Sequence, residues 1–573
     1  MADHSGPPLP EVPYSSVPQL VAAQAAKDPE RVALKQRGPS GKWQELSFGA
    51  LDEQRRAYAA GLGALGVKRS DVVAVVAQNS AEMLAAELAV QTLGAASAPI
   101  FAGYSEELLT HCIADSGARV ALAGTALQQR QLSGARNLER IVVLDDQPLP
   151  GERALPLRAL RGAGLADESL ATRDDVAFLL YTSGTTGKPK GVELTHWNAL
   201  SQQAAIANLW DVNENDVFLS YLPWHHCFGA LFERLMALWH RALLVVDDSR
   251  GRDLNRLYSN FFEVRPTVYF GVPRVYNGMI ARAQEDAKSR EVLKSLRFAF
   301  SAAAPISEPA FRWFESLGVP VLEGWGLTET SPCVTITRKD SQRAPGVVGQ
   351  PLPGTTVRIE PSEGFGNRGE IVVKGPQVMR GYHNRPEETK AVLDGGFFRS
   401  GDLGEWTEGG VKLSGRVDGV FKLENGEKVS SGEVEARILA ATPLLEQALA
   451  VGPGQTFVTA LCWLAPGAAQ AYLRQRDLEI PSDLTQAPEL RRAVVEALQA
   501  SNLLSPVYYE RVRRIAFVRE APTLESGELT PTQKLVRGAV LEAQAPLVAA
   551  LRTGDPHPQV ADIVRGGAAF EQA

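Results

Sequence analysis

Cysteine is scarce in this chain of 573 residues. Its four cysteines lie far apart, at Cys112, Cys227, Cys333 and Cys462. They form no Cys-x-x-Cys pair and no dense framework of the kind that stabilises small secreted domains, which excludes that class of protein. We therefore expect reduced thiols and a cytoplasmic protein.

Long hydrophobic runs are also missing. Residues 1–20 contain several prolines and no apolar core flanked by basic residues, which argues against a signal peptide. The most apolar stretch, residues 83–100, is interrupted by Glu87 and Gln91 and has small residues where a membrane span has large ones. We therefore expect no transmembrane segment, and we interpret residues 83–100 as a buried helix.

The chain has no excess of positive charge. It carries 59 Lys and Arg against 66 Asp and Glu, so its formal net charge at pH 7 is −7. No overall basic field exists to attract nucleic acid, and any phosphate recognition must be local. With 45% hydrophobic and 22% charged residues, the composition is that of a globular protein able to bury sizeable cores.

The order of predicted elements indicates an α/β fold. Residues 71–78 form a Val/Ala run of strand length, and Asn79 with Glu82 resembles a capping box that begins a helix. Such strand–helix steps recur, which favours layers of helices on mostly parallel strands. The other expected strands lie near residues 119–122, 141–144, 218–222, 242–247 and 268–270.

The pattern of predicted secondary structure changes twice towards the C-terminus. From about residue 346, short Val-rich runs punctuated by glycine predict a β-rich subdomain. After residues 415–419 come mixed strands and helices, ending in an Ala-rich helical tail from about residue 538. We therefore predict a large N-terminal body, residues 1–417, and a small α+β C-terminal domain, residues 418–573.

The strongest local signal is residues 181–192, which follow an apolar strand. Glycines that let backbone N–H groups converge, hydroxyl donors and lysines together suit a polyphosphate. A Walker A loop needs four residues before its Gly-Lys-Ser/Thr, whereas here only Thr185 and Thr186 separate the two glycines, and Pro189 follows the lysine. The predicted phosphate ligands are Thr182, Ser183, Gly184, Thr185, Thr186, Gly187, Lys188 and Lys190.

This loop resembles the signature of the adenylate-forming superfamily, which includes acyl-CoA synthetases, luciferases and peptide-synthetase adenylation domains. The further motifs occur in the family's order, from about residue 20 to residue 540. Residues 324–330, Gly-Trp-Gly-Leu-Thr-Glu-Thr, resemble the family's aromatic-Gly-x-Thr-Glu motif. The resemblance implies that Trp325 stacks on adenine, that Thr328 bonds a phosphate, and that Glu329 binds Mg²⁺ together with Thr185.

Three further segments extend the resemblance to the sugar, the base and the acyl group. Residues 301–305 resemble the segment beside the adenine, which implicates Ala303, although other members have glycine at one or two of these positions. Asp402 and Arg416 resemble the pair that binds the ribose hydroxyls. Residues 222–229 resemble the Pro-x-x-His segment, in which His226 orients the carboxylate and Trp224 is an aromatic gate, whereas His225 is structural.

Near the C-terminus, Lys534 lies in a loop whose family counterpart places a lysine in the nucleotide site. The sequence of this loop, Glu-Leu-Thr-Pro-Thr-Gln-Lys-Leu, resembles that of the long-chain fatty acid branch more than that of aryl or short-chain members. Because this lysine occupies the approach of a second substrate, the resemblance implies a mobile C-terminal domain that turns about Asp418. The other interpretation of Asp418, that it merely ends a strand, stays open.

The activity that the resemblance implies is ATP-dependent conversion of a fatty acid to an acyl-adenylate and then to a CoA thioester, with release of AMP and pyrophosphate. Mg²⁺ is the expected cofactor, and ATP and CoA are the co-substrates. Two alternatives remain: a fatty acyl-AMP ligase that delivers to a carrier protein, and a catalytically silent nucleotide- or lipid-binding relative. Acyl chain length, oligomeric state and peripheral membrane contact are left open by the sequence.

Overall fold

The computed structural model describes residues 2–151, 153–166, 169–183, 188–302, 304, 306–341, 343–361, 367–505, 507–530, 534–553 and 556–563. Gly184, Thr185, Thr186, Gly187 and Ala303, predicted to bind ATP, lie outside these residues, and of Ser183 only the backbone is described. The chain divides into two compact units. The first comprises Met1–Arg358, Val372–Ser400 and Trp406–Lys412, and the second comprises Ile359–Ile371, Gly401–Glu405 and Leu413–Ala573.

The first large sheet has eight strands in the order β20-β10-β9-β5-β4-β6-β7-β8. Its central strands are parallel, whereas β10 pairs antiparallel with β9 and with β20. The strands are β4 (Val72–Val76), β5 (Ala96–Pro99), β6 (Val120–Ala123), β7 (Arg140–Val143), β8 (Ala154–Pro156), β9 (Val176–Ser183), β10 (Pro189–Thr195) and β20 (Gly381–Tyr382).

The second large sheet has nine strands in the order β17-β16-β15-β14-β13-β11-β12-β2-β3. Strands β15 to β2 along this order are parallel, and antiparallel strands close both edges. The strands are β2 (Val32–Arg37), β3 (Trp43–Ser47), β11 (Val217–Ser220), β12 (Leu243–Val246), β13 (Val268–Gly271), β14 (Phe298–Ser301), β15 (Val321–Trp325), β16 (Thr335–Ile336) and β17 (Gln350–Pro351).

The helices of the first unit mostly connect these strands. They are α1 (Val17–Lys27), α2 (Phe48–Ala64), α3 (Ala81–Thr92), α4 (Glu106–Ser116), α5 (Ala126–Gln131), α6 (His196–Ile206), α7 (Leu235–His240), α8 (Leu254–Val264), α9 (Pro273–Glu285), α10 (Ala287–Leu293), α11 (Glu308–Ser316) and α12 (Pro386–Val392). Three short segments are wound differently: the 3-10 helices η1 (Leu157–Ala163) and η3 (Thr328–Thr330), and the π-helix η2 (Phe228–Arg234).

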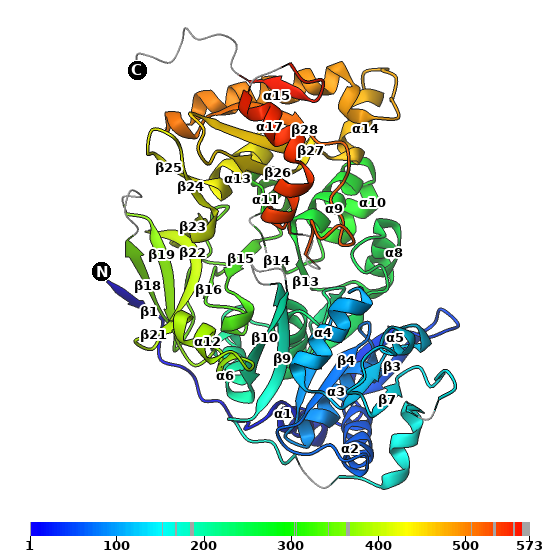
Figure 1. Ribbon diagram of the computed structural model, residues 1–573. Helices are drawn as coiled ribbons and strands as arrows, with labels where there is room; N and C mark the ends of the chain where they lie inside the picture. Colours follow the sequence, from blue (N-terminus) through cyan, green and yellow to red (C-terminus); the bar gives the residue numbers. More distant parts are fainter. Residues whose placement is uncertain are drawn as a thin grey trace. The chain divides into compact units, whose positions relative to one another are not determined.

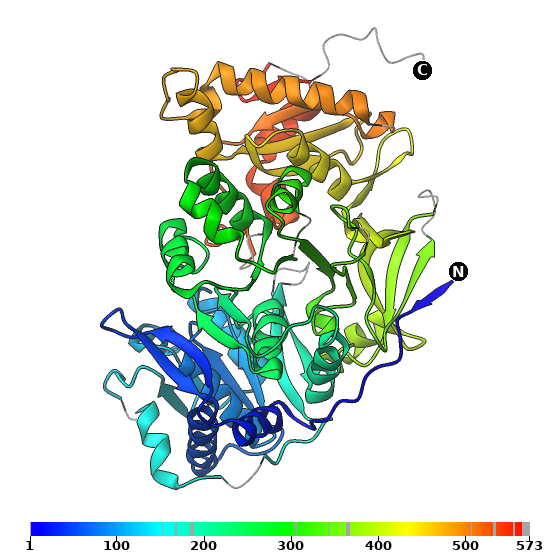
Figure 2. The same cartoon turned by 180° about the vertical axis from the view of Figure 1, so that it is seen from behind.

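Both large sheets are covered on two faces. Along β4, Val73 and Val75 pack into the core that also holds α3, while Ala74 and Val76 face the cluster that contains α4. Strand β4 and both helices are labelled in Figure 1. In β13, Phe270 likewise faces the core that holds α3, and the alternate side chains face the cluster of α8 to α11, the green helices of Figure 2. Because side chains alternate across a strand, uniformly apolar strands require such double cover. The predicted α/β layers are confirmed.

Helix α3 lies in the core that the two sheets share, and it differs from the prediction in two ways. The expected helix over residues 83–100 ends at Thr92, and the buried strand β5 follows. Gly94, with φ +71°, supplies the left-handed residue that terminates it. The predicted capping box is also wrong, because Ser80, not Asn79, is the N-cap and accepts the Met83 N–H at 3.1 Å.

A third sheet is built from the β-rich part of the chain, in the order β1-β18-β19-β22-β21, with β23 beside β22. Within the first unit, the ring of His4 stacks on Trp406 at 3.6 Å between centroids. The strands are β1 (Asp3–Ser5), β18 (Thr356–Pro361), β19 (Gly369–Lys374), β21 (Leu393–Asp394), β22 (Phe397–Thr407) and β23 (Gly410–Arg416).

The C-terminal part of the second unit is a separate α+β fold, as predicted. A four-stranded sheet, β26-β27-β28-β29, has one hydrophobic cluster on each face, and β24 pairs with β25 in a small ribbon. Its elements are η4 (Val417–Gly419), β24 (Val420–Lys422), β25 (Lys428–Ser430), α13 (Ser431–Ala441), β26 (Leu445–Val451), β27 (Val458–Leu464), α14 (Pro466–Arg474), η5 (Leu484–Gln486), α15 (Pro488–Leu504), η6 (Tyr508–Glu510), β28 (Val512–Phe517), α16 (Arg537–Ala543), α17 (Ala545–Thr553) and β29 (Val560–Asp562). Among the described residues, no helix is long and apolar enough to cross a bilayer.

Candidate active site

The predicted phosphate loop joins two antiparallel strands. Strand β9 leads into it and β10 leads out, with Thr182 opposite Lys190 in the register. In a Walker A motif a helix follows the loop, so this local fold agrees with the exclusion made from the spacing. The hydroxyl of Tyr181 on β9 donates to the Asp115 carboxylate at 3.0 Å and to the Cys112 carbonyl at 2.9 Å, which fixes the strand against α4.

The two predicted lysines differ in their surroundings. Lys188 is exposed, whereas Lys190 is half-buried and its Nζ lies 2.5 Å from the Glu388 carboxylate. This hydrogen bond, first among the causes, lowers the pKa of Glu388 below its usual range. The same ammonium group lies 5.3 Å from the ring centroid of Tyr382. In this conformation Lys190 is therefore held by side chains of its own unit.

Glu329, predicted to bind Mg²⁺, is held in place by two hydrogen bonds. It lies in η3, directly after β15, and the Tyr382 hydroxyl donates to its Oε1 at 2.8 Å. The Met379 N–H donates to its backbone carbonyl, also at 2.8 Å. Tyr382 thus contacts both Glu329 and Lys190, two residues that the sequence assigns to the phosphates and their metal.

The single carboxylate of Glu329 suits Mg²⁺ that is bound together with a nucleotide better than it suits a metal ion bound by protein side chains alone. Among the residues described, no group of three His, Cys, Asp or Glu side chains could hold a metal ion. Mg²⁺ in nucleotide sites usually takes one or two carboxylates and completes its shell with phosphate oxygens and water. A carboxylate already oriented by a tyrosine hydroxyl supplies the protein's share of such a shell.

The segment with the predicted acyl-site histidine lies between β11 and η2. The Phe228 N–H donates to His226 Nδ1 at 3.3 Å. Because Nδ1 accepts this bond, the neutral imidazole carries its proton on Nε2 and can donate from there. The next residue, Cys227, is buried, and its Sγ lies 3.3 Å from the Thr328 hydroxyl. The predicted acyl and nucleotide motifs therefore meet at this contact.

Trp224 and His225 of this segment differ in burial, because His225 is only half-buried. Trp224 is fully buried, and the guanidinium of Arg234 lies 4.9 Å from its ring. His225 packs on Phe101 at 4.8 Å between centroids, and burial lowers its pKa to about 3, so it is neutral. The gate role of Trp224 stays a prediction.

Trp325 ends β15 and is 6% exposed. The residue after it must be glycine, because a Cβ on Gly326 would lie 1.7 Å from the Pro332 carbonyl oxygen. This close backbone approach explains the glycine of the motif and fixes the turn that leads from Trp325 to Thr328. Stacking of Trp325 on adenine stays a prediction.

In the second unit, the predicted ribose ligands and hinge residue form one chain of ion pairs. Arg416 Nη1 lies 2.7 Å from the Asp402 carboxylate, and Arg416 Nε lies 3.0 Å from the Asp418 carboxylate. Lys534 is exposed, and its backbone N–H donates to the Thr530 hydroxyl at 3.0 Å. The sequence order of these residues gave no hint that Asp418 pairs with the ribose arginine.

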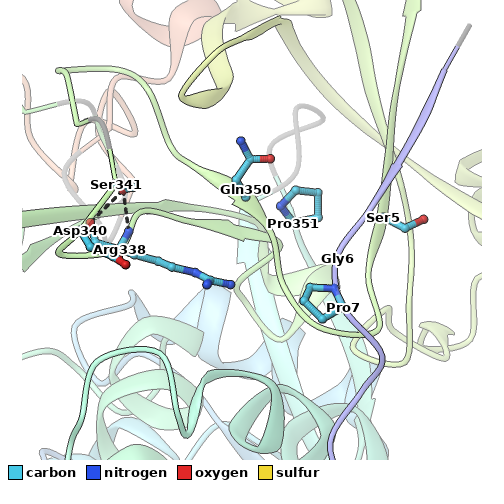
Figure 3. A pocket seen from close by; sticks show the side chains of 8 residues that line it. All are labelled: Ser5, Gly6, Pro7, Arg338, Asp340, Ser341, Gln350 and Pro351. Atoms are coloured by element: carbon cyan, nitrogen blue, oxygen red, sulfur yellow. Dashed lines mark hydrogen bonds between the residues drawn. The ribbon is translucent and has the colours of Figure 1, made fainter.

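A surface hollow of about 390 Å³ lies in the first unit but holds none of the predicted residues. It is lined by the N-terminal segment around Ser5 to Pro7 and by the loop of Arg338 and Asp340, as Figure 3 shows. It is open to solvent, and its lining includes the polar side chains of Arg338, Asp340 and Gln350 but no residue of the predicted motifs. The chemistry therefore belongs with the contacts described above.

Comparison with known families assigns the chain. Residues 21–383 match the family described as AMP-binding enzyme, and residues 418–551 match the C-terminal domain of AMP-binding enzymes. The chain belongs to the family of AMP-binding enzymes. The predicted adenylate-forming superfamily is thereby confirmed. With it comes the family's chemistry, in which a carboxylic acid is activated with ATP and then forms a thioester with CoA.

Relatives of this AMP-binding enzyme span most of its length. It is 28% identical to a long-chain-fatty-acid–CoA ligase of Mycobacterium bovis, with 92% of this chain and 96% of the relative covered. It is 30% identical to an oxalate–CoA ligase of Arabidopsis thaliana, with 76% and 85% covered. Among solved structures, ATP-bound MatB from Rhodopseudomonas palustris matches with a TM-score of 0.75 and 25% identity, covering 93% of this chain and 99% of that one.

In this AMP-binding enzyme the fold brings two further residues to the predicted ones and makes one contact that the sequence did not indicate. Tyr382 binds Glu329 from 53 residues away, and Asn79 bonds the segment around Trp224. The Cys227–Thr328 contact joins residues 101 positions apart. Tyr382 and Asn79 belong to none of the predicted motifs, and the motifs of Cys227 and Thr328 did not indicate that the two side chains meet. The one signal for a role of Asn79 was its position directly before Ser80, which already caps α3 and leaves the asparagine side chain for another contact.

Proposed function

We propose that this AMP-binding enzyme is an ATP-dependent long-chain fatty acid–CoA ligase that forms AMP and pyrophosphate. The observation that carries the proposal is the contact between Cys227 and Thr328. Cys227 directly follows His226, the proposed carboxylate ligand, and its Sγ contacts Thr328, the proposed phosphate ligand. That adjacency is what attack of a carboxylate on the α-phosphate of ATP requires.

In the first half-reaction, a carboxylate oxygen of the fatty acid attacks the α-phosphorus of ATP. A new O–P bond forms, the bond to the bridging oxygen breaks, and pyrophosphate leaves with the bonding electrons. His226 Nε2–H orients the carboxylate, Thr328 bonds a phosphate oxygen, and Lys534 offsets the repulsion between two anions. Mg²⁺, when bound at Glu329 and Thr185, supplies charge neutralisation for the departing pyrophosphate.

The remaining ATP contacts are assigned from the family motif. The residues of the phosphate loop that the structure leaves undescribed, with Ala303, complete the proposed site beside Thr182, Lys188 and Lys190. Trp325 covers the adenine, and Asp402 with Arg416 binds the ribose. The Asp402–Arg416 ion pair at 2.7 Å supports a joint role, because it brings the two proposed ribose ligands together.

In the second half-reaction, the CoA thiolate attacks the acyl carbonyl of the adenylate. A thioester bond forms, the acyl–phosphate bond breaks, and AMP leaves. Since Lys534 serves only the first step, we propose that the C-terminal domain, residues 418–573, turns about Asp418 between the steps. The position of Asp418 in a short 3-10 turn between β23 and β24 supports a hinge there.

A long acyl chain is the finer part of the proposal. It is supported by the loop before Lys534 and by the coverage of the Mycobacterium relative over nearly the whole chain. The oxalate relative, at similar identity, favours a short dicarboxylate instead. Each buried CH₂ contributes roughly 0.8 kcal/mol, so a pocket for long chains discriminates steeply against short ones. We also propose a cytoplasmic location and leave the oligomeric state open.

A panel of acids tests this proposal. Purified enzyme is assayed with ATP and CoA on acetate, oxalate, benzoate, octanoate, laurate and palmitate, and kcat/KM is compared. We expect kcat/KM to rise with chain length to a plateau at about twelve or more carbons. A higher value for acetate, oxalate or benzoate than for palmitate would contradict the long-chain assignment. Acyl-AMP formation without CoA acylation would favour a carrier-protein acceptor.

A further inference from the structure

Asn79 holds the backbone on both sides of Pro223. Its Nδ2 donates to the Leu222 carbonyl at 2.8 Å, and the Trp224 N–H donates to its Oδ1 at 2.9 Å. Asn79 follows β4 of the first sheet, whereas the bonded segment follows β11 of the second sheet. One planar amide therefore links the two sheets of the first unit at the start of the His226 segment.

These two bonds fix the path of the segment closely. The His226 N–H donates to the Pro223 carbonyl at 3.1 Å, so the turn that carries His226 closes directly onto the bracketed proline. On the other side, Gly229 packs so tightly that a Cβ there would lie 2.6 Å from the same carbonyl oxygen. A shift of Pro223 would therefore be passed to the imidazole, with little room for adjustment.

Helix α3 provides a second attachment eight residues after Asn79. Glu87 and Arg234, 1% and 2% exposed, form an ion pair at 2.5 Å, and Arg234 lies against Trp224. Asn79 and Glu87 thus fix the chain on both sides of His226, at Leu222–Trp224 and at Arg234. Helix α3 is buried on nearly every side in the core between the sheets, which makes it a rigid support.

We propose that Asn79 is a positioning residue that acts on the reaction through His226. The inference rests on the proposed role of His226 in orienting the carboxylate. Asn79 is not needed to cap α3, because Ser80 does so. Its two hydrogen bonds serve the His226 segment, and their loss lets the imidazole leave the geometry in which Nε2–H meets the carboxylate. A misplacement of about 1 Å can lower a rate as much as a hundredfold.

A double-mutant cycle tests the inference. We compare wild type, Asn79→Ala, His226→Ala and the double variant by kcat/KM for the acid, measured with saturating ATP and CoA. Asn79→Asp, which has almost the same shape but loses the donor to Leu222, serves if the alanine variant folds poorly. Asn137→Ala is the matched control, because its amide also bonds two backbone carbonyls in this unit, those of Ile113 and Ala118, outside the site.

If Asn79 acts through His226, its replacement lowers kcat/KM for the acid by about tenfold to a hundredfold in wild type. In the His226→Ala background the same replacement should cost less than about twofold, because the residue on which it acts is gone. The control should lower the melting temperature with little change in kcat/KM. Equal losses in both backgrounds would overturn the inference. No loss in His226→Ala itself would instead overturn the proposed role of His226.

Discussion

At the scale of single residues, the side chain of Glu323 is a carboxyl group that the fold keeps largely protonated at neutral pH. It lies on β15, two residues before Trp325, and is 4% exposed. Burial, the first cause, raises its pKa to about 8 from an ordinary value of 4.5, against the hydrogen bonds that it accepts from backbone N–H groups. The folded state therefore binds this proton more tightly than the unfolded chain does.

The sign of the stability effect follows from this shift. A group with a raised folded pKa stabilises fully below pH 4.5, and that contribution is lost as the pH rises to about 8. We expect Glu323→Gln to reduce the loss of unfolding free energy between pH 5.5 and pH 8.5 by a few kcal/mol. Urea unfolding at both values measures it. Parallel pH curves for the two proteins would contradict the raised pKa.

Tyr382 gives a second prediction at this scale. Tyr382→Phe removes the hydroxyl that orients Glu329 and keeps the ring under Lys190. We expect the Mg²⁺ concentration for half-maximal activity to rise about threefold to tenfold, in the direction of Glu329→Gln but less far. The gain in melting temperature on adding Mg²⁺ and ATP should shrink in parallel, which is a readout independent of turnover.

Tyr258→Phe is the matched control for that measurement. Its hydroxyl is buried in the first unit and donates at 2.7 Å to the Met279 carbonyl, outside the site. It should lower stability and leave the Mg²⁺ requirement unchanged. If Glu329→Gln changes the Mg²⁺ requirement and Tyr382→Phe does not, the orienting role of Tyr382 is wrong.

Residue roles were predictable only where a short motif carries them. Thr328 and His226 stand in spacing patterns, so the sequence indicated both, but their connection through Cys227 needed the fold. Tyr382 and Asn79 contact the site over separations of 53 and 145 residues, and no local pattern marks such pairs. The ribose roles of Asp402 and Arg416 came from the family resemblance and stay predictions, and the structure adds that the two side chains form an ion pair.

At the scale of elements, periodicity located the strands well and the helix ends poorly. Strands near residues 120, 141, 218, 243 and 268 were predicted because runs buried on both faces have no polar positions. Residues 83–100 have few polar positions, and these did not reveal the change from helix to strand. A buried helix and a buried strand look alike there, and only Gly94 marks the boundary.

The segment η4 yields a prediction for the two half-reactions. Asp418→Pro fixes φ near −65° and should slow transfer from supplied acyl-AMP to CoA by about tenfold or more, with adenylation less affected. Lys534→Ala should do the reverse, because its charge is needed only where two anions meet. Each half-reaction is measured separately on folded protein. Equal losses of both steps in both variants would contradict the hinge and the lysine assignment.

At the scale of the whole molecule, one chain carries a nucleotide motif, an acyl motif and a small C-terminal domain. The first unit places the Pro-x-x-His segment and the Thr-Glu turn in contact, because both follow parallel strands of the second large sheet, β11 and β15. Groups at the carboxyl ends of parallel strands meet at one edge, where such sheets bind ligands. Chemistry that needs both a carboxylate and a triphosphate fits this edge.

The most direct test is to identify the products formed from ATP. Purified enzyme is incubated with ATP, Mg²⁺ and palmitate, with and without CoA, and AMP, ADP, pyrophosphate, phosphate and palmitoyl-CoA are quantified against a reaction without acid. With CoA present, AMP, pyrophosphate and palmitoyl-CoA should form in equal amounts that depend on palmitate. Without CoA, pyrophosphate should still form with palmitate but free AMP should not accompany it, because AMP stays in the acyl-adenylate. ADP and phosphate as the primary products, or AMP that forms without any acid, would contradict the proposed activity.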